Sequence, residues 1–177
     1  MVTGSIEREI VIAAPRERVW EVLTQAEFLG AWFGADAPAE IDLRPGGRMV
    51  LDHGPRGRLP ARIERVEGPG RFSFRWSPGA AGTGAAVAAS ASASGEEAGT
   101  GAAAGGSTLV EFTLTREPGN HTRLRMVESG FTALAPLTAD TRIRCEQDGT
   151  DWTWKLTELA CHTERITARR PRMTENS

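Results

Sequence analysis

Hydrophobic and polar residues alternate along several short stretches of the chain, and a repeat of two residues predicts β-strands. In chain order these stretches are residues 5–13, 39–43, 49–53, 59–67, 72–76, 110–114 and 124–128. Turn sequences rich in glycine and proline separate several of them, for example Pro45-Gly46-Gly47. Strands joined by such short turns pair antiparallel, so the pattern predicts an antiparallel sheet of about six to seven strands.

A repeat of three and four residues, which is typical of helices, appears in three other segments. Two short helices are predicted directly after the first strand, the first opening at Pro15 and the second running from Ala26 to Phe33. The third segment lies near the C-terminus, where five residues, all apolar except one threonine, step by four, three, four and three residues. They are Trp152, Leu156, Leu159, Thr163 and Ile166. This spacing predicts one face of a long C-terminal helix.

The order of these elements predicts an α+β fold. A strongly curved antiparallel sheet must cover its concave face, and only the C-terminal helix is long enough to do so. We therefore expect the sheet to wrap around this helix in a single domain over residues 1–168. A helix held in a curved sheet leaves a cleft, which predicts a pocket without naming its ligand.

Residues 78–106 differ in composition from the rest of the chain. Twenty of these 29 residues are Ala or Gly, so the segment cannot bury enough apolar surface to offset its chain entropy. We expect a mobile insertion between two strands, and a frayed polar tail over residues 169–177.

Composition narrows the expected partners and compartment. The net charge of −2 does not indicate a nucleic-acid surface, and no apolar run approaches the ~20 residues of a membrane span. Cys145 and Cys161 lie on one predicted helix roughly 24 Å apart, too far for a disulfide. Free thiols, together with an N-terminus unlike a secretion signal, favour the cytoplasm.

His53 and Glu128 are the most prominent polar candidates for chemistry. By the two-residue repeat, His53 shares a face with Met49 and Leu51, and Glu128 shares one with Met126. An inward carboxylate beside an imidazole is suited to general acid/base catalysis or to holding the polar end of a ligand. Alternatively, both residues lie at strand ends, where water reaches them.

Aromatic residues flank the expected cleft, and rings of this kind dominate apolar ligand pockets. Aromatic residues of an ordinary hydrophobic core would show the same pattern in the sequence. Both interpretations, pocket lining and core, therefore stay open. The predicted ligand contacts are Trp32, Phe33, Met49, Leu51, His53, Trp76, Phe112, Met126, Glu128, Trp152 and Leu156. Trp154 lies two positions after Trp152 and is expected on another face of the helix.

No catalytic, metal or cofactor motif is recognisable. His53, His121 and His162 lie in separate elements without ligand spacing such as HExxH. Neither a GxSxG nucleophile elbow nor a GxGxxG or phosphate-binding loop occurs. We therefore assign no metal, no cofactor and no catalytic residue.

A resemblance to a known superfamily rests on motifs spread over nearly the whole chain outside residues 78–106. They are Ala14-Pro15-Arg16-Glu17-Arg18-Val19-Trp20, Ala31-Trp32-Phe33-Gly34, Asp42-Leu43-Arg44-Pro45-Gly46-Gly47-Arg48, Arg71-Phe72-Ser73-Phe74-Arg75-Trp76, Thr122-Arg123-Leu124 and Glu128-Ser129-Gly130-Phe131, with Trp152 and Leu159 on the last helix. In this order they resemble the SRPBCC superfamily of START, birch-pollen-allergen and polyketide-cyclase domains. The most similar branch is that of the activator of heat-shock-protein-90 ATPase.

The resemblance implies a helix-grip fold with a hydrophobic cavity between the sheet and the long helix. It leaves three functions open. The first is non-catalytic binding of a small hydrophobic or amphipathic ligand in that cavity. The second is a co-chaperone-like domain that docks on a chaperone or another protein, and the third is a cyclase- or hydrolase-type enzyme that uses His53 and Glu128. A homodimer also stays open.

Overall fold

The structure is a computed structural model that describes residues 5–33, 38–52, 58–76, 107–130 and 139–169. For Asp52 and for residues 139–150 the description is of the backbone only. His53, the predicted insertion at 78–106 and the tail beyond residue 169 lie outside these ranges.

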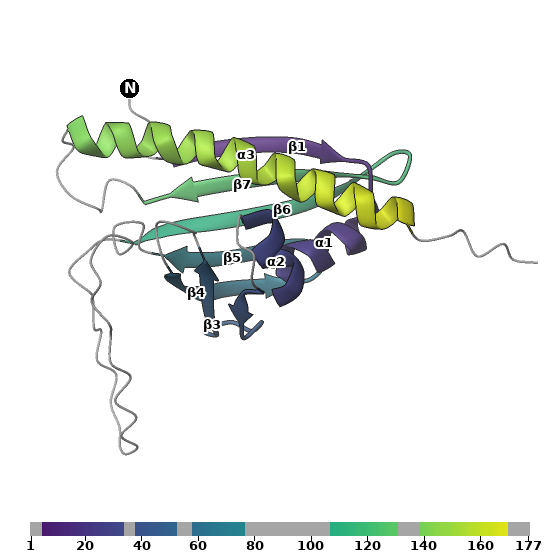
Figure 1. The fold of residues 1–177 in the computed structure, drawn as a ribbon, viewed down its shortest axis with the longest axis horizontal. Coiled ribbons are helices and arrows are strands. Elements are labelled where there is room, and N and C mark those ends of the chain that lie inside the picture. The colour runs from purple at the N-terminus through teal and green to yellow at the C-terminus, as the bar shows by residue number, and fades with distance from the viewer. Residues whose placement is uncertain (1–4, 34–37, 53–57, 77–106, 131–138, 170–177) are drawn as a thin grey trace, which may run out of the picture.

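The strands form one antiparallel sheet of seven strands in the order β1-β7-β6-β5-β4-β3-β2 (Figure 1). Their bounds are β1 Ser5–Ile12, β2 Glu40–Ile41, β3 Arg48–Asp52, β4 Arg58–Glu67, β5 Arg71–Trp76, β6 Thr108–Glu117 and β7 His121–Ser129. Apart from β1, which pairs with β7, each strand pairs with strands next to it in the chain. The predicted antiparallel sheet and α+β class are confirmed.

Three helices accompany the sheet, and they confirm the helix-grip arrangement. Their bounds are α1 Arg16–Thr24, α2 Ala26–Phe33 and α3 Ala139–Arg169. With 31 residues, α3 is about 46 Å long and lies along β1, next to α1 and α2 (Figure 1). It begins well before its apolar stripe, so Gly149 lies inside the helix. Despite this length, neither α3 nor another described helix holds an apolar stretch that could cross a membrane.

The inner face of the sheet and the apolar stripes of the helices form one core. Alternate strand residues point inward, as Phe72, Phe74 and Trp76 do on β5. On α3, Trp152 and Leu156 pack into the same core and are almost completely buried. Burying a side chain such as Leu156 contributes roughly 1.5–3 kcal/mol, so the helix is held mainly by this stripe.

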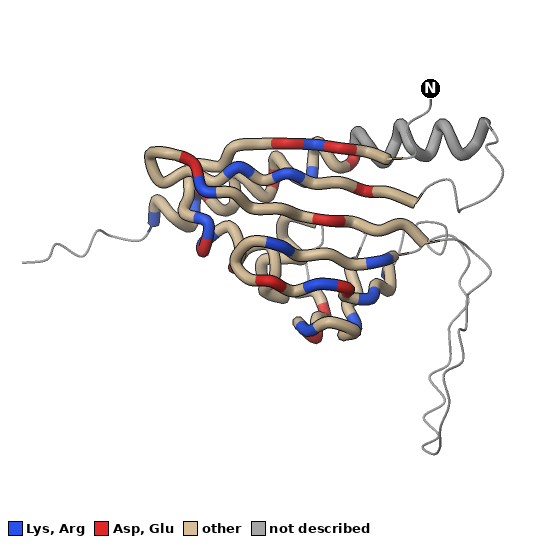
Figure 2. The backbone as a smooth tube through the Cα atoms, turned by 180° about the vertical axis from the view of Figure 1, so that it is seen from behind, with Lys and Arg blue, Asp and Glu red and all other residues tan. Residues whose placement is uncertain are grey.

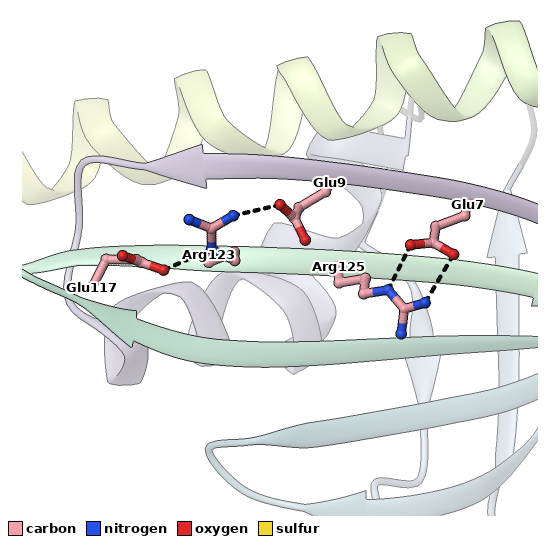
Figure 3. A network of polar contacts seen from close by, with 5 residues as sticks. All are labelled: Glu7, Glu9, Glu117, Arg123 and Arg125. Atoms are coloured by element: carbon pink, nitrogen blue, oxygen red, sulfur yellow. Dashed lines mark hydrogen bonds and ion pairs between the residues drawn. The ribbon is translucent and has the colours of Figure 1, made fainter.

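Opposite charges meet on the outer face of β1, β6 and β7 (Figure 3). Arg125 donates two hydrogen bonds to Glu7, with N–O distances of 2.7 and 2.8 Å. Arg123 bridges Glu9 and Glu117, with N–O distances of 2.5 and 2.6 Å. The hydrogen bonds from Arg125 lower the pKa of Glu7 below its usual value. These five charged residues of β1, β6 and β7 are thus matched across neighbouring strands.

The turn before β3 requires a glycine at position 47. A Cβ on Gly47 would lie 2.0 Å from the backbone oxygen of Asp42, far inside any real contact distance. In the turn before β5, a Cβ on Gly70 would meet its nearest atom, the backbone oxygen of Glu67, at an ordinary 3.7 Å. The two turn glycines therefore differ in their tolerance of a side chain.

We expect Gly47→Ala to lower the free energy of unfolding by about 1–3 kcal/mol, because the new methyl group forces the turn apart. Gly70→Ala is the matched control and should change stability by less than about 1 kcal/mol. Urea unfolding of the two variants measures the difference. Equal losses in both would contradict the close approach at Gly47.

The ion pair of Glu7 with Arg125 makes stability depend on pH. Because the folded chain holds the pKa of Glu7 below its usual 4.5, the pair stabilises the fold above that pH. This stabilisation is lost as the pH falls through the lowered pKa. We expect Glu7→Gln to lower Tm near pH 7 and to have little effect at about pH 3.

Glu111→Gln is the control for this titration. Glu111 is exposed on the same face of the sheet and makes no ion pair within the described part of the chain, and its attraction to Arg125 is the smallest of the causes that raise the pKa of that arginine. Its substitution should therefore change Tm little at either pH. If Glu7→Gln shifts Tm by the same amount at both pH values, the ion pair does not carry the pH dependence.

Candidate functional site

A carboxyl group lies within the apolar interior. Glu128 is on β7, opposite Ile6 of β1 and Val110 of β6, and its side chain is fully buried. The interpretation in which water reaches Glu128 at a strand end is therefore wrong. The strand does end one residue later, but side chains from other elements cover the carboxyl group.

Three side chains donate hydrogen bonds to Glu128. The indole Nε1 of Trp76 and the hydroxyl of Thr108 donate to Oε1 at 2.9 and 2.6 Å. The indole Nε1 of Trp152 donates to Oε2 at 2.6 Å. A buried donor that loses its acceptor costs about 1–3 kcal/mol. Because the donors belong to β5, β6 and α3, this one carboxyl group ties the long helix to the sheet.

Aromatic rings pack around the carboxyl group, mostly edge to face. The ring centroid of Trp152 lies 5.8 Å from that of Trp76 and 5.9 Å from that of Phe112. Phe33, the last residue of α2, lies 5.8 Å from Trp76 and 6.4 Å from Trp152. Trp32 contacts Phe33 at 5.4 Å. Such pairs contribute about 0.5–1.5 kcal/mol each beyond their burial, so the rings hold one another in place.

The only lysine in the chain is buried in the same cluster. Lys155 follows Trp152 by about one helical turn and is 3% exposed. Its Nζ lies 4.6 Å from the ring centroid of Phe33 and 5.5 Å from that of Trp152, within the range of cation–π attraction. Lysine is rarely buried in this way. The interior thus holds an amine and a carboxyl group in contact with the same tryptophan.

The structure places the predicted ligand contacts together in the interior, with the exception of His53, which lies outside the described residues. Those placed there are Trp32, Phe33, Met49, Leu51, Trp76, Phe112, Met126, Glu128, Trp152 and Leu156. Their contact with a ligand stays a prediction, as does the pairing of His53 with Glu128. Trp154 is 51% exposed, as expected for another face of the helix.

Two residues of the cluster, Thr108 and Lys155, are missing from the sequence-based prediction. The two-residue repeat through Val110 and Phe112 extends back to Thr108 and would have placed it inward. Lys155 lies three positions after Trp152, on the helix face that the apolar stripe already marks. In both cases only the position within the repeat indicates burial. The polar side chain itself is not typical of an apolar repeat.

Within the described part of the chain, the other ionisable residues form no comparable buried cluster. His162 packs against Phe28 with ring centroids 5.7 Å apart, and partial burial, with Arg165 nearby, lowers its pKa. Within the described ranges, no three His, Cys, Asp or Glu side chains come together in a group that could hold a metal ion.

A family profile matches most of the chain. The profile is described as "Activator of Hsp90 ATPase homolog 1-like protein" and matches residues 13–160. The chain belongs to this family. A comparison with curated protein sequences found no match.

Solved structures share the fold of this Hsp90-activator-like chain at low identity. Protein MLL2253 from Mesorhizobium loti has a TM-score of 0.61 and 23% identity, over 93% of this chain and 97% of its own. Protein BH1534 from Bacillus halodurans gives 0.62 and 22%, over 89% and 95%. The Aha1 dimer from Colwellia psychrerythraea gives 0.58 and 17%, over 92% and 97%. At these identities the likeness establishes the fold alone.

The hydrogen bond between Trp152 and Glu128 can be tested on α3 itself. We expect Trp152→Phe to lower the free energy of unfolding by about 1–3 kcal/mol, because it removes the indole donor to a buried acceptor. Trp154→Phe is the same change two residues later at an exposed position, and we expect it to cost less than about 0.5 kcal/mol. Urea unfolding provides both values, and similar losses would show that the hydrogen bond contributes little.

Proposed function

We propose that the protein binds a small amphipathic molecule between the sheet and α3 and does not transform it. The observation that supports this most is the cluster of Glu128, Lys155 and aromatic rings in the interior. Ligand sites are mostly apolar and contain a few convergent polar groups that orient the ligand. This cluster has that composition, and membership of the family supports a ligand-binding or partner-binding domain in general.

The charge of the cluster indicates which end of the ligand it receives. Both oxygens of Glu128 already accept hydrogen bonds from protein donors. The Lys155 Nζ lies over the faces of Phe33 and Trp152 and attracts an anion. In the proposed complex, the ligand brings an acidic polar group next to Lys155 and has an aromatic or aliphatic body.

The alternative of a cyclase- or hydrolase-type enzyme is less well supported. A general acid or base must come within hydrogen-bond reach of the substrate. Glu128 instead orients three side chains of the protein itself. That alternative depends on His53, which lies outside the described residues.

We extend the proposal to the compartment and to a protein partner. Cys161 is exposed with a free thiol, which suits a reducing compartment such as the cytoplasm. Trp154, exposed on α3, is a candidate contact for a second copy of the chain. In support of such a homodimer, one structural relative is described as a dimer.

A matched pair of fluorescent probes tests the proposed site. N-phenyl-1-naphthylamine is uncharged, whereas 8-anilinonaphthalene-1-sulfonate adds an anionic group to nearly the same rings. We expect both to bind, and the sulfonate to bind more tightly. Lys155→Met should weaken binding of the sulfonate about tenfold and that of the neutral probe less than twofold. Fluorescence titration measures each dissociation constant.

Trp154→Phe is the control and should change neither dissociation constant. If neither probe binds the wild-type chain, the interior does not bind such ligands and the proposal fails. If both bind but Lys155→Met affects them equally, the interior binds apolar molecules and the assignment of an acidic end is wrong.

A further inference from the structure

Three arginines stand in a row across neighbouring strands on the outer face of the sheet. In the strand register, Arg48 of β3 is opposite Arg62 of β4, and Arg62 is opposite Arg75 of β5. All three are exposed, and inward residues such as Phe74 and Trp76 flank Arg75 in the chain. Figure 2 shows basic segments on the neighbouring strands in this half of the sheet. We call Arg48, Arg62 and Arg75 the arginine row.

Like charges directly opposite each other on a sheet are destabilising. Acidic residues relieve the repulsion among the three arginines only partly. Arg75 makes an ion pair with Glu64 at 3.3 Å, but neither Arg48 nor Arg62 forms an ion pair with any described residue. The carboxylate next to Arg48 across the sheet edge is Asp42, and it already bonds Arg44 at 2.7 Å.

The opposite half of the same face shows that this arrangement is not a general property of the sheet. On β1 and β7, Arg123 and Arg125 are each matched by glutamates. In that half of the sheet, the arginines of β7 are therefore paired with glutamates of neighbouring strands. A local conflict without a local compensating gain is the kind of feature that marks a functional surface.

We propose that the arginine row is a docking surface for an acidic α-helix of a partner protein. Guanidinium groups bind carboxylates with two parallel hydrogen bonds, so a row of arginines fits a row of carboxylates. This surface is on the face of the sheet opposite the proposed ligand site and is independent of it.

The spacing of the row favours a helix over an extended segment. Neighbouring strands are about 4.8 Å apart, so the three arginine positions span roughly 10 Å. Glutamates at positions i, i+3 and i+7 of a helix lie on one face and span about the same distance. In an extended chain, three residues on one side span about 14 Å and overshoot the row.

The test uses two labelled helical peptides of the same composition. One carries three glutamates at i, i+3 and i+7, and the other distributes them around the helix. Fluorescence anisotropy should show tighter binding of the first peptide, weakened by added salt. Replacing the whole row, in the variant Arg48→Gln with Arg62→Gln and Arg75→Gln, should weaken binding about tenfold. Equal binding of the two peptides, or no effect of this variant, would overturn the proposal.

Matched variants separate the row from general basic charge. Arg71→Gln changes an exposed arginine on β5 about 13 Å along the strand from Arg75. It should alter peptide binding less than twofold, whereas Arg62→Gln alone should weaken it measurably. Lys155→Met, in the interior, should have no effect. If a labelled DNA duplex binds more tightly than the acidic peptide and needs the same arginines, the proposed occupant is wrong.

A stability measurement tests whether the like charges of the arginine row destabilise the fold. Arg62→Glu places a carboxylate between two arginines, so we expect Tm to rise by about 1–3 °C while peptide binding falls. This opposite movement also shows that lost binding is not lost folding. A fall in Tm would mean that the row is not in conflict, which removes the reason to regard it as a binding surface.

Discussion

The hydrogen bonds to Glu128 are the constraint on which the interior depends. A buried carboxyl group and three buried donors would each be costly alone, but together they satisfy one another. The donors come from β5, β6 and α3, so this mutual satisfaction fixes where the long helix lies on the sheet. The positions of the surrounding rings follow, because Trp76 and Trp152 are both donors and walls of the cluster. Hydrophobic burial holds α3 on the sheet, and the hydrogen bond from Trp152 to Glu128 ties the helix to β7.

Charged residues of this chain lie in three kinds of environment. Inside, Glu128 is satisfied by hydrogen bonds, and Lys155 lies against aromatic faces. On the outer face of β1 and β7, charges are paired across strands, which suits exposed residues and contributes modestly to stability. In the arginine row, Arg75 has a carboxylate partner in Glu64, whereas Arg48 and Arg62 have none among the described residues. The unmatched charge of these two arginines is better explained by a binding partner than by the folding of the chain itself.

The sequence predicts well whether a side chain points toward the core or toward solvent. It predicts poorly how deeply that side chain is buried. Two-residue and four-residue repeats placed Trp76, Trp152 and Glu128 inward, and each of them is buried. They could not distinguish a water-exposed strand end from a covered one, because the covering rings come from elements far away in the chain. For the same reason the repeats carried no information on which donors reach Glu128. The arginine row depends on strand register, and register across β3, β4 and β5 follows from turn geometry and the bulge between Ile63 and Arg65.

The two proposed sites share a strand and remain separable. Arg75 and Trp76 are consecutive on β5, and strand geometry directs one to the outer face and the other to the inner face. Arg75 belongs to the arginine row, whereas Trp76 donates to Glu128. A substitution of Arg75 leaves the inner hydrogen bonds in place, and a change at Lys155 leaves the outer charges in place. Membership of a family whose fold serves several roles does not choose between ligand binding and docking. The alternation of β5 does allow one chain to do both, because each face of the sheet can meet its own partner.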